Sequence, residues 1–89
     1  MTLLVIRHKV NDYPAWRAAF DAHAGRKSAG LANERVTRSL DDANELVLLF
    51  EVTDLAKARA FCASDDLRSA MRGAGVVDTP DLYFLDDAG

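Results

Sequence analysis

The first ten residues follow a pattern typical of a strand that packs one face on a core. Residues 2–10 are rich in leucine and β-branched side chains, and such a run favours a strand. Successive side chains of a strand point to opposite faces, so Leu4, Ile6, His8 and Val10 share one face. An imidazole is therefore expected among three aliphatic side chains.

A helical pattern begins directly after this strand. Asp12, with Asn11 before it, offers an N-cap, and Pro14 falls in the first helical turn, where a missing N–H costs nothing. We expect Gly25 or Gly30 to end the helix. The positions that share its predicted apolar face, three and four residues apart, are Trp16, Ala19, Phe20, His23 and Ala24.

Two further strands are predicted in the middle of the chain. Residues 31–40 and 46–52 have the composition of strands, and the second is strongly apolar. The turn-forming residues 41–44 separate the two runs, so the strands should form a hairpin.

The last third of the chain predicts more helix and a final strand. Asp54 is the expected N-cap of a helix that runs to residue 61, and Ser64 is the expected N-cap of a further helical segment to residue 72. Gly73 or Gly75 should stop that segment. Residues 82–85 then form a short last strand, which completes the order β-α-β-β-α-β.

An internal repeat supports this order. The two halves align at an offset of 42 residues, and the identical pairs include Val5/Val47, Val10/Val52, Asp12/Asp54, Arg17/Arg59 and Ala18/Ala60. Two copies of a β-α-β unit build an α+β, ferredoxin-like sandwich, with both helices on one face of an antiparallel sheet of strand order 4-1-3-2. We expect residues 1–89 to form one such domain. In this alignment His8 matches Phe50.

The sheet face away from the helices also reads as apolar. Residues 46–50 are apolar at every position, whereas a solvated face would be polar at every second one. A chain of 89 residues with one cysteine has a marginal core and no intramolecular disulfide. The sequence therefore predicts a homodimer packed through the sheet faces. The alternative is a monomer with this face partly exposed.

Charge is divided unevenly along the chain. Residues 1–40 carry a net charge of +4 and residues 41–89 a net charge of −7, for a total of −3. The cations of the first part are spread singly, so we expect neutralisation between strands, with Arg7, Arg35 and Arg38 opposite acidic residues, and no nucleic-acid partner. No stretch approaches the roughly 20 apolar residues of a membrane span, and no signal sequence is evident. We expect a cytoplasmic protein without a membrane partner.

Three stretches resemble the dimeric α/β-barrel superfamily. They are D-Y-x-x-W-x-x-x-F-D-x-H at 12–23, N-E-L-V-L-L-F-E-V-x-D at 44–54 and S-D-D-L-R-S-A-M at 64–71. Within the superfamily the chain is most similar to the antibiotic-biosynthesis-monooxygenase-like branch and its uncharacterised small relatives. The resemblance implies a dimer whose sheets form a barrel, with a cavity between sheet and helices. Members include cofactor-free oxygenases, haem-degrading enzymes, polyketide cyclases, isomerases and proteins without known activity.

The chain departs from the haem-degrading members in three places. Those proteins use an asparagine on the first strand, a tryptophan on the sheet and a histidine on the second helix. Here the first strand has no asparagine, Trp16 is on the first helix, and the second helix has no histidine. We expect neither haem nor another cofactor, and two distant histidines are a poor metal signal.

His8 is the candidate catalytic residue. Burial on an apolar face would lower its pKa and keep the ring neutral, as a general base or a polar anchor in a pocket requires. The competing interpretation is a core histidine with a satisfied hydrogen bond.

Four further residues are candidates for binding a substrate. Trp16, Phe20 and Phe50 could line a pocket for a flat apolar molecule, or simply fill the core. His23 lies on the same helical stripe and could form an acid–base pair with His8 if the two converge, or serve only at the helix end.

Three hypotheses about function follow. The first is an enzyme-like protein with a small-molecule pocket, a cofactor-independent monooxygenase or cyclase that acts on an aromatic or polyketide-like compound. The second is a non-catalytic dimeric module that binds a metabolite or a protein. The third is a stress-related or accessory protein in which the barrel is purely structural. Whether it is an enzyme at all stays open at this point, because fold membership does not define chemistry.

Overall fold

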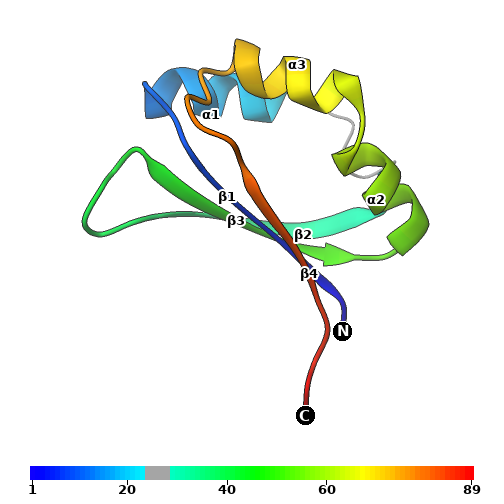
Figure 1. The fold of residues 1–89 in the computed structure, drawn as a ribbon. Coiled ribbons are helices and arrows are strands. Elements are labelled where there is room, and N and C mark those ends of the chain that lie inside the picture. Colours follow the sequence, from blue (N-terminus) through cyan, green and yellow to red (C-terminus); the bar gives the residue numbers. More distant parts are fainter. Residues whose placement is uncertain (24–28) are drawn as a thin grey trace.

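The computed structural model describes residues 1–23 and 29–89 and contains one antiparallel sheet. The order of strands across the sheet is β2-β3-β1-β4, which confirms the predicted order. β1 and β3 are central, and the chain termini lie at the same end of the sheet (Figure 1). The strands are β1 (Leu3–Lys9), β2 (Leu31–Arg38), β3 (Glu45–Val52) and β4 (Asp81–Leu85).

All helices of the described residues lie on one side of this sheet (Figure 1). They are α1 (Tyr13–Ala22), α2 (Leu55–Cys62) and α3 (Asp65–Gly73). α2 and α3 follow each other closely in the second half of the chain, as the two predicted cap sites implied. The architecture is the predicted ferredoxin-like α+β sandwich.

The core fills the space between the sheet and the helices. Alternate residues of β1 and β3 face it, and Ile6 pairs directly with Leu48. His8 lies on this same face, opposite Leu46, and only 1% of its surface is exposed. The buried residues of the core cluster are Leu4, Ile6, Val10, Trp16, Leu31, Leu46, Leu48, Phe50 and Ala58.

The helix caps confirm the internal repeat. The side chain of Asp12 accepts a hydrogen bond from the Ala15 N–H at 3.3 Å, and that of Asp54 accepts one from the Lys57 N–H at 3.1 Å. Both caps have extended backbones with nearly equal dihedral angles. Ser64 caps α3 in the same way, as expected. The repeat-related residues Asp12 and Asp54 therefore have the same capping role in the two halves.

Two sequence-based boundaries need correction. α1 ends at Ala22, and Gly30 does not stop it. Gly30 instead has a left-handed φ of 76° directly before β2, where a Cβ would lie 2.6 Å from the backbone oxygen of Asp54. Gly25, the other proposed stop, lies outside the described residues. β2 ends at Arg38, because Leu40 belongs to the hairpin turn and is fully exposed.

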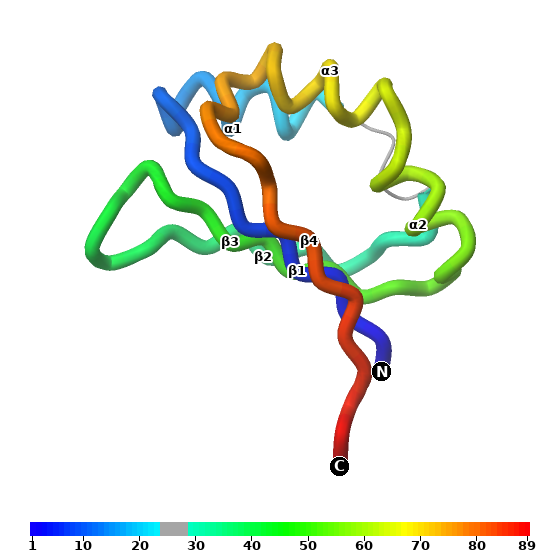
Figure 2. Tube along the Cα trace, in the orientation of Figure 1, coloured from blue at the N-terminus to red at the C-terminus, as the bar shows by residue number. Residues whose placement is uncertain are grey.

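The expected neutralisation between strands is centred on Arg7. Its guanidinium lies 2.9 Å from Glu45, 3.4 Å from Asp78 and 3.2 Å from Asp81. β1 and β4 run side by side (Figure 2). Near the chain ends, the N-terminal ammonium group lies 3.0 Å from the Asp87 carboxylate.

Arg38 does not take part in the predicted charge pairing. It donates a hydrogen bond to the backbone oxygen of Ala43 and lies 4.0 Å over the ring of Tyr13. The reason is the face of the sheet that it occupies: Arg38 pairs with Leu46 and lies on the helix side, whereas Glu45 of the same neighbouring strand faces the other side.

Capping by Asp12 and Asp54 can be measured. Replacing either residue with alanine leaves first-turn N–H groups without an acceptor, and should lower the free energy of unfolding by about 1 kcal/mol. Asp12→Asn and Asp54→Asn are matched controls, because asparagine caps as well as aspartate. Urea denaturation checks this, and alanine variants with the parental midpoint would contradict it.

Candidate functional site

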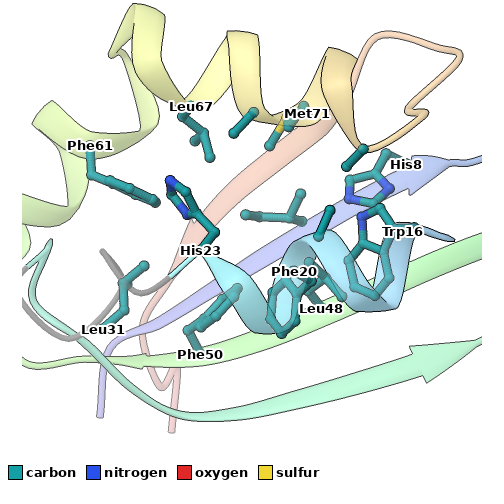
Figure 3. Close-up of a pocket in the computed structure, with 14 residues that line it drawn as sticks. His8, Trp16, Phe20, His23, Leu31, Leu48, Phe50, Phe61, Leu67 and Met71 are labelled. Atoms are coloured by element: carbon teal, nitrogen blue, oxygen red, sulfur yellow. The ribbon is translucent and has the colours of Figure 1, made fainter. Parts of the chain in front are cut away.

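A hollow opens inside the helix–sheet layer, and we call it the inner pocket. Its cavity volume is about 60 Å³, and all the space between atoms inside it and at its open mouth amounts to about 530 Å³. All five residues selected from the sequence line it, from β1, α1 and β3: His8, Trp16, Phe20, His23 and Phe50 (Figure 3). The remaining lining is almost entirely apolar, as in pockets that bind flat organic molecules.

Two helices contribute residues to the pocket walls, and these residues have the same spacing along each helix. α1 and its C-cap residue contribute Trp16, Ala19, Phe20 and His23, at positions i, i+3, i+4 and i+7. The segment of α3 and its cap contributes residues 67, 70, 71 and 74, with the same intervals. Sequence reasoning did not select residues 67, 70, 71 and 74 for the site. Their helical spacing could have indicated them, because residues spaced in this way lie on one face of a helix and meet the same neighbour.

His8 is a polar residue of this pocket that is buried among apolar side chains. Its Nδ1 atom is buried and has no hydrogen-bond partner. The ring contacts Trp16 edge to face, with 5.8 Å between the ring centres. A buried polar atom without a partner costs about 1–3 kcal/mol, so a ligand that hydrogen-bonds to Nδ1 would recover that free energy.

Burial also fixes the protonation state of His8. The loss of hydration lowers the pKa of the imidazole below its ordinary value of 6.5. The nearby Asp78 carboxylate raises the pKa in part, and the Arg7 guanidinium lowers it further. The ring is therefore neutral at pH 7 and has a lone pair with which to accept a proton.

Trp16 belongs to a stack of aromatic rings along α1. Its ring centre lies 5.9 Å from that of Tyr13 and 4.8 Å from that of Phe20, and both pairs are nearly parallel. Arg38 covers Tyr13, and Arg17 lies 5.6 Å from the centre of the Phe20 ring. The stack holds the Trp16 ring in place against His8.

His23 and His8 are on the same pocket but do not meet. Figure 3 shows His8 beside Trp16 at one end, and His23 near Phe61 and Leu67 toward the other. The His23 ring centre lies 6.1 Å from that of Phe61. A ligand that fills the pocket would touch both imidazoles, whereas direct proton transfer between the two rings is not supported by this geometry.

Other candidate chemistry is weak in the described part of the chain. Cys62 is half-buried on α2, and burial raises the pKa of its thiol, which keeps it protonated. Residues 1–23 and 29–89 contain no group of three histidine, cysteine or acidic side chains placed to hold a metal ion. No helix among those residues is long and apolar enough to cross a membrane.

Solved structures of the same architecture are numerous, although no protein-family model and no curated protein sequence matches this chain. A putative antibiotic biosynthesis monooxygenase from Bordetella bronchiseptica superposes with a TM-score of 0.76 at 14% identity, over 98% of this chain and 96% of the other. A second, from Caulobacter crescentus, gives 0.73 at 18% identity, over 99% and 90% of the two chains. SnoaB, a cofactor-independent oxygenase from Streptomyces nogalater, gives 0.69 at 17% identity, over 98% and 94%.

Fold and site together define a class of protein. It is a ferredoxin-like α+β domain with an apolar pocket between the sheet and its helices. Within that class, the chain has the fold of the two structures named as antibiotic biosynthesis monooxygenases and of the SnoaB oxygenase. At these identities the likeness establishes the fold, and the chemistry has to be argued from the pocket itself.

The depressed pKa of His8 predicts a pH dependence of stability. The unfolded chain binds a proton at this imidazole near pH 6.5, whereas the folded chain does so only at a lower pH. The free energy of unfolding is therefore retained above pH 6.5 and falls as the pH decreases from 6.5 to the folded-state pKa, by at most about 1.4 kcal/mol per pH unit. Urea denaturation between pH 5 and 7.5 should show this slope in the parent and not in His8→Phe. Equal slopes in the two proteins would contradict it.

Proposed function

We propose that the inner pocket binds a small aromatic or polyketide-like molecule and that His8 acts as a general base on it, in a cofactor-independent oxygenation or cyclisation. The observation that carries this proposal is the unpartnered, neutral Nδ1 of His8 on the wall of an apolar pocket. A phenol or an activated methylene group of the ligand would supply the missing hydrogen-bond donor. The shared fold with SnoaB supports the oxygenase version.

The chemistry needs only the ligand, His8 and molecular oxygen. His8 accepts a proton from the acidic O–H or C–H group, which leaves an electron-rich anion in the pocket. In an oxygenation, this anion gives its electrons to O₂ and forms a carbon–oxygen bond. In a cyclisation, it attacks a carbonyl carbon of the same molecule. The aromatic walls from Trp16, Phe20 and Phe50 would hold the rings and exclude water, and His23 would contact the far end.

A non-catalytic binding protein is the second candidate. The observation in its favour is that His23 lies at the other end of the pocket, so that His8 has no second titratable group beside it within the pocket to return the proton. The two candidates differ in one measurement. An enzyme consumes the ligand with uptake of O₂ or loss of a carbonyl group, whereas a binding protein returns the ligand unchanged.

The outer face of the sheet supports a homodimer as part of this proposal. Val5 pairs with Leu49 on one side and with Tyr83 on the other, and these side chains point away from the helices. Tyr83 and Leu85 are 53% and 47% exposed. A continuous apolar surface across β3, β1 and β4 favours burial against a second copy.

His8→Phe tests the base. Phenylalanine is the residue of the repeat-related position and removes the unpartnered nitrogen, so the variant should be as stable as the parent or more stable. It should lose turnover because no base remains. Anthrone is a suitable probe, since proton loss from its methylene group and reaction with O₂ give anthraquinone and water. Oxygen uptake without added metal or cofactor is the measurement.

A second substitution excludes a steric explanation. His8→Leu also removes the base but leaves more room in the pocket, so both variants should lose oxygen uptake while retaining their fold. If the variants are destabilised and turn over the probe at the parental rate, His8 is a core residue and the assignment is wrong.

Leu49→Glu tests the dimer. Leu49 is on the outer face, whereas the neighbouring Leu48 is buried in the core, so a charge at position 49 should prevent dimerisation without filling the core with a carboxylate. Leu40→Glu is the matched control, because Leu40 is fully exposed in the hairpin turn. Light scattering should give twice the chain mass for the parent and for Leu40→Glu, and a lower mass for Leu49→Glu. A parent of monomer mass at micromolar concentration would rule the dimer out.

A further inference from the structure

A second hollow lies on the other flank of α3, between this helix and the segment that leads into β4. We call it the outer groove, and its cavity volume is about 360 Å³. Leu67, Met71, Val76 and Leu82 give it an apolar floor, and Arg68 and Arg72 stand on its rim. Nothing in the proposed chemistry of the inner pocket uses this groove.

The two hollows share part of their lining. Leu67 and Met71 belong to both the inner pocket and the outer groove, and they lie one helical turn apart. These two side chains therefore form the partition between the hollows. Leu67 is 9% exposed and part of the core, whereas Met71 is half-buried and has an unbranched, flexible side chain. Of the two side chains, that of Met71 can change rotamer more easily.

The charge at the rim of the outer groove is positive, although the protein as a whole is acidic. The side chain of Arg72 has no ion pair, hydrogen bond or ring contact within the described residues, and its backbone oxygen accepts from the Gly75 N–H. Arg68 lies 3.6 Å from Asp65, but the carboxylate of Asp65 is 96% exposed, so this pair is weak. Asp78 also lines the groove, and it is already bound by Arg7 at 3.4 Å and by the Lys9 N–H at 2.8 Å. The two guanidinium groups are thus available to an anion.

From this arrangement we propose that the outer groove is the acid-binding half of the ligand site. The ligand is an aromatic carboxylic acid: its ring lies in the inner pocket with an acidic O–H or C–H group at His8, and its carboxylate crosses the partition to Arg72 and Arg68. The Met71 side chain turns aside to join the two hollows. This assignment rests on the proposed function of the inner pocket and narrows its substrate class to anionic aromatics.

Two probes separate the carboxylate from the ring. 2-Naphthol is neutral at pH 7 and tests the inner pocket alone, whereas 6-hydroxy-2-naphthoate carries the same phenol and a carboxylate at the opposite end. Trp16 is the single tryptophan and lines the inner pocket, so its fluorescence reports on occupancy, and titration calorimetry gives the affinities. The hydroxynaphthoate should bind at least about ten-fold more tightly than 2-naphthol, because charge-assisted hydrogen bonds to guanidinium are strong.

Arg72→Gln should remove most of this ten-fold preference and leave the affinity for 2-naphthol within about two-fold of the parental value. Lys57→Gln is the matched control, because it removes one exposed positive charge from α2 and lines neither hollow. It should leave both affinities unchanged. An equal loss in Arg72→Gln and Lys57→Gln would show a general charge effect and overturn the assignment.

The partition is tested separately with Met71→Ile. A β-branched side chain is stiff in a helix, so this variant should weaken the hydroxynaphthoate several-fold more than it weakens 2-naphthol, which meets Met71 only as part of the inner-pocket wall. An unchanged affinity for the acid would overturn the movable partition. If 2-naphthol binds the parent and the acid binds no better, the acid site is wrong while the inner pocket stands. If neither probe binds, the proposed function fails together with this inference.

Discussion

The antiparallel pairing of β1 with β3 determines which side chains face the helices and which face away. Its register sets His8 opposite Leu46 under the helices, and leaves Arg7 on the outer face. A slip of one residue would exchange these two side chains, because successive residues of a strand alternate between faces. Arg7 opposes that slip: its ion pairs with Glu45 and Asp81 would be lost, and its charge would enter the apolar core. The position of the pocket histidine thus depends on a charged neighbour that never touches the pocket.

His8 is a polar residue at a buried position that favours an apolar ring. The equivalent residue of the second half is Phe50, which is buried on the same face and lines the same pocket. An imidazole in this slot buries less apolar surface than phenylalanine and leaves Nδ1 without a partner. Most positions of the chain agree with the fold at every level, and departures from such agreement are expected at functional sites. This contrast between repeat-related residues is what separates His8 from the other buried residues.

Features set by local interactions could be predicted from the sequence. The caps at Asp12, Asp54 and Ser64 each need only a side-chain oxygen and an N–H group three residues on, and all three form. The hairpin turn at residues 41–44 is closed by its own side chains in the same way, with Asp42 accepting from the Asn44 N–H. Because the fold is two copies of one local pattern, the strand order followed from these signals.

Some features set by contacts between distant residues could not be predicted. Arg38 stacks on Tyr13 because the end of β2 approaches the start of α1, and no spacing in the sequence expresses that approach. The inner pocket depends on side chains of α3 such as Met71. The helical spacing of these residues is evident in the sequence, but the part of the fold against which they pack is not. Whether two apolar surfaces pack closely or leave a hollow depends on the volumes and rotamers of all side chains together, and periodicity does not carry that information.

α3 carries a local positive charge within the acidic half of the chain. Residues 41–89 contain four cations, and in the fold they do not simply neutralise the eleven acidic side chains of that part. Arg59 covers the ring of Phe84, while Arg68 and Arg72 line the outer groove beside the partition. An acidic protein repels anions at long range, but at physiological ionic strength that repulsion is screened beyond about 8 Å. At shorter range an anion meets the two guanidinium groups at the edge of the apolar partition, so local placement of charge, rather than net charge, decides what this surface attracts.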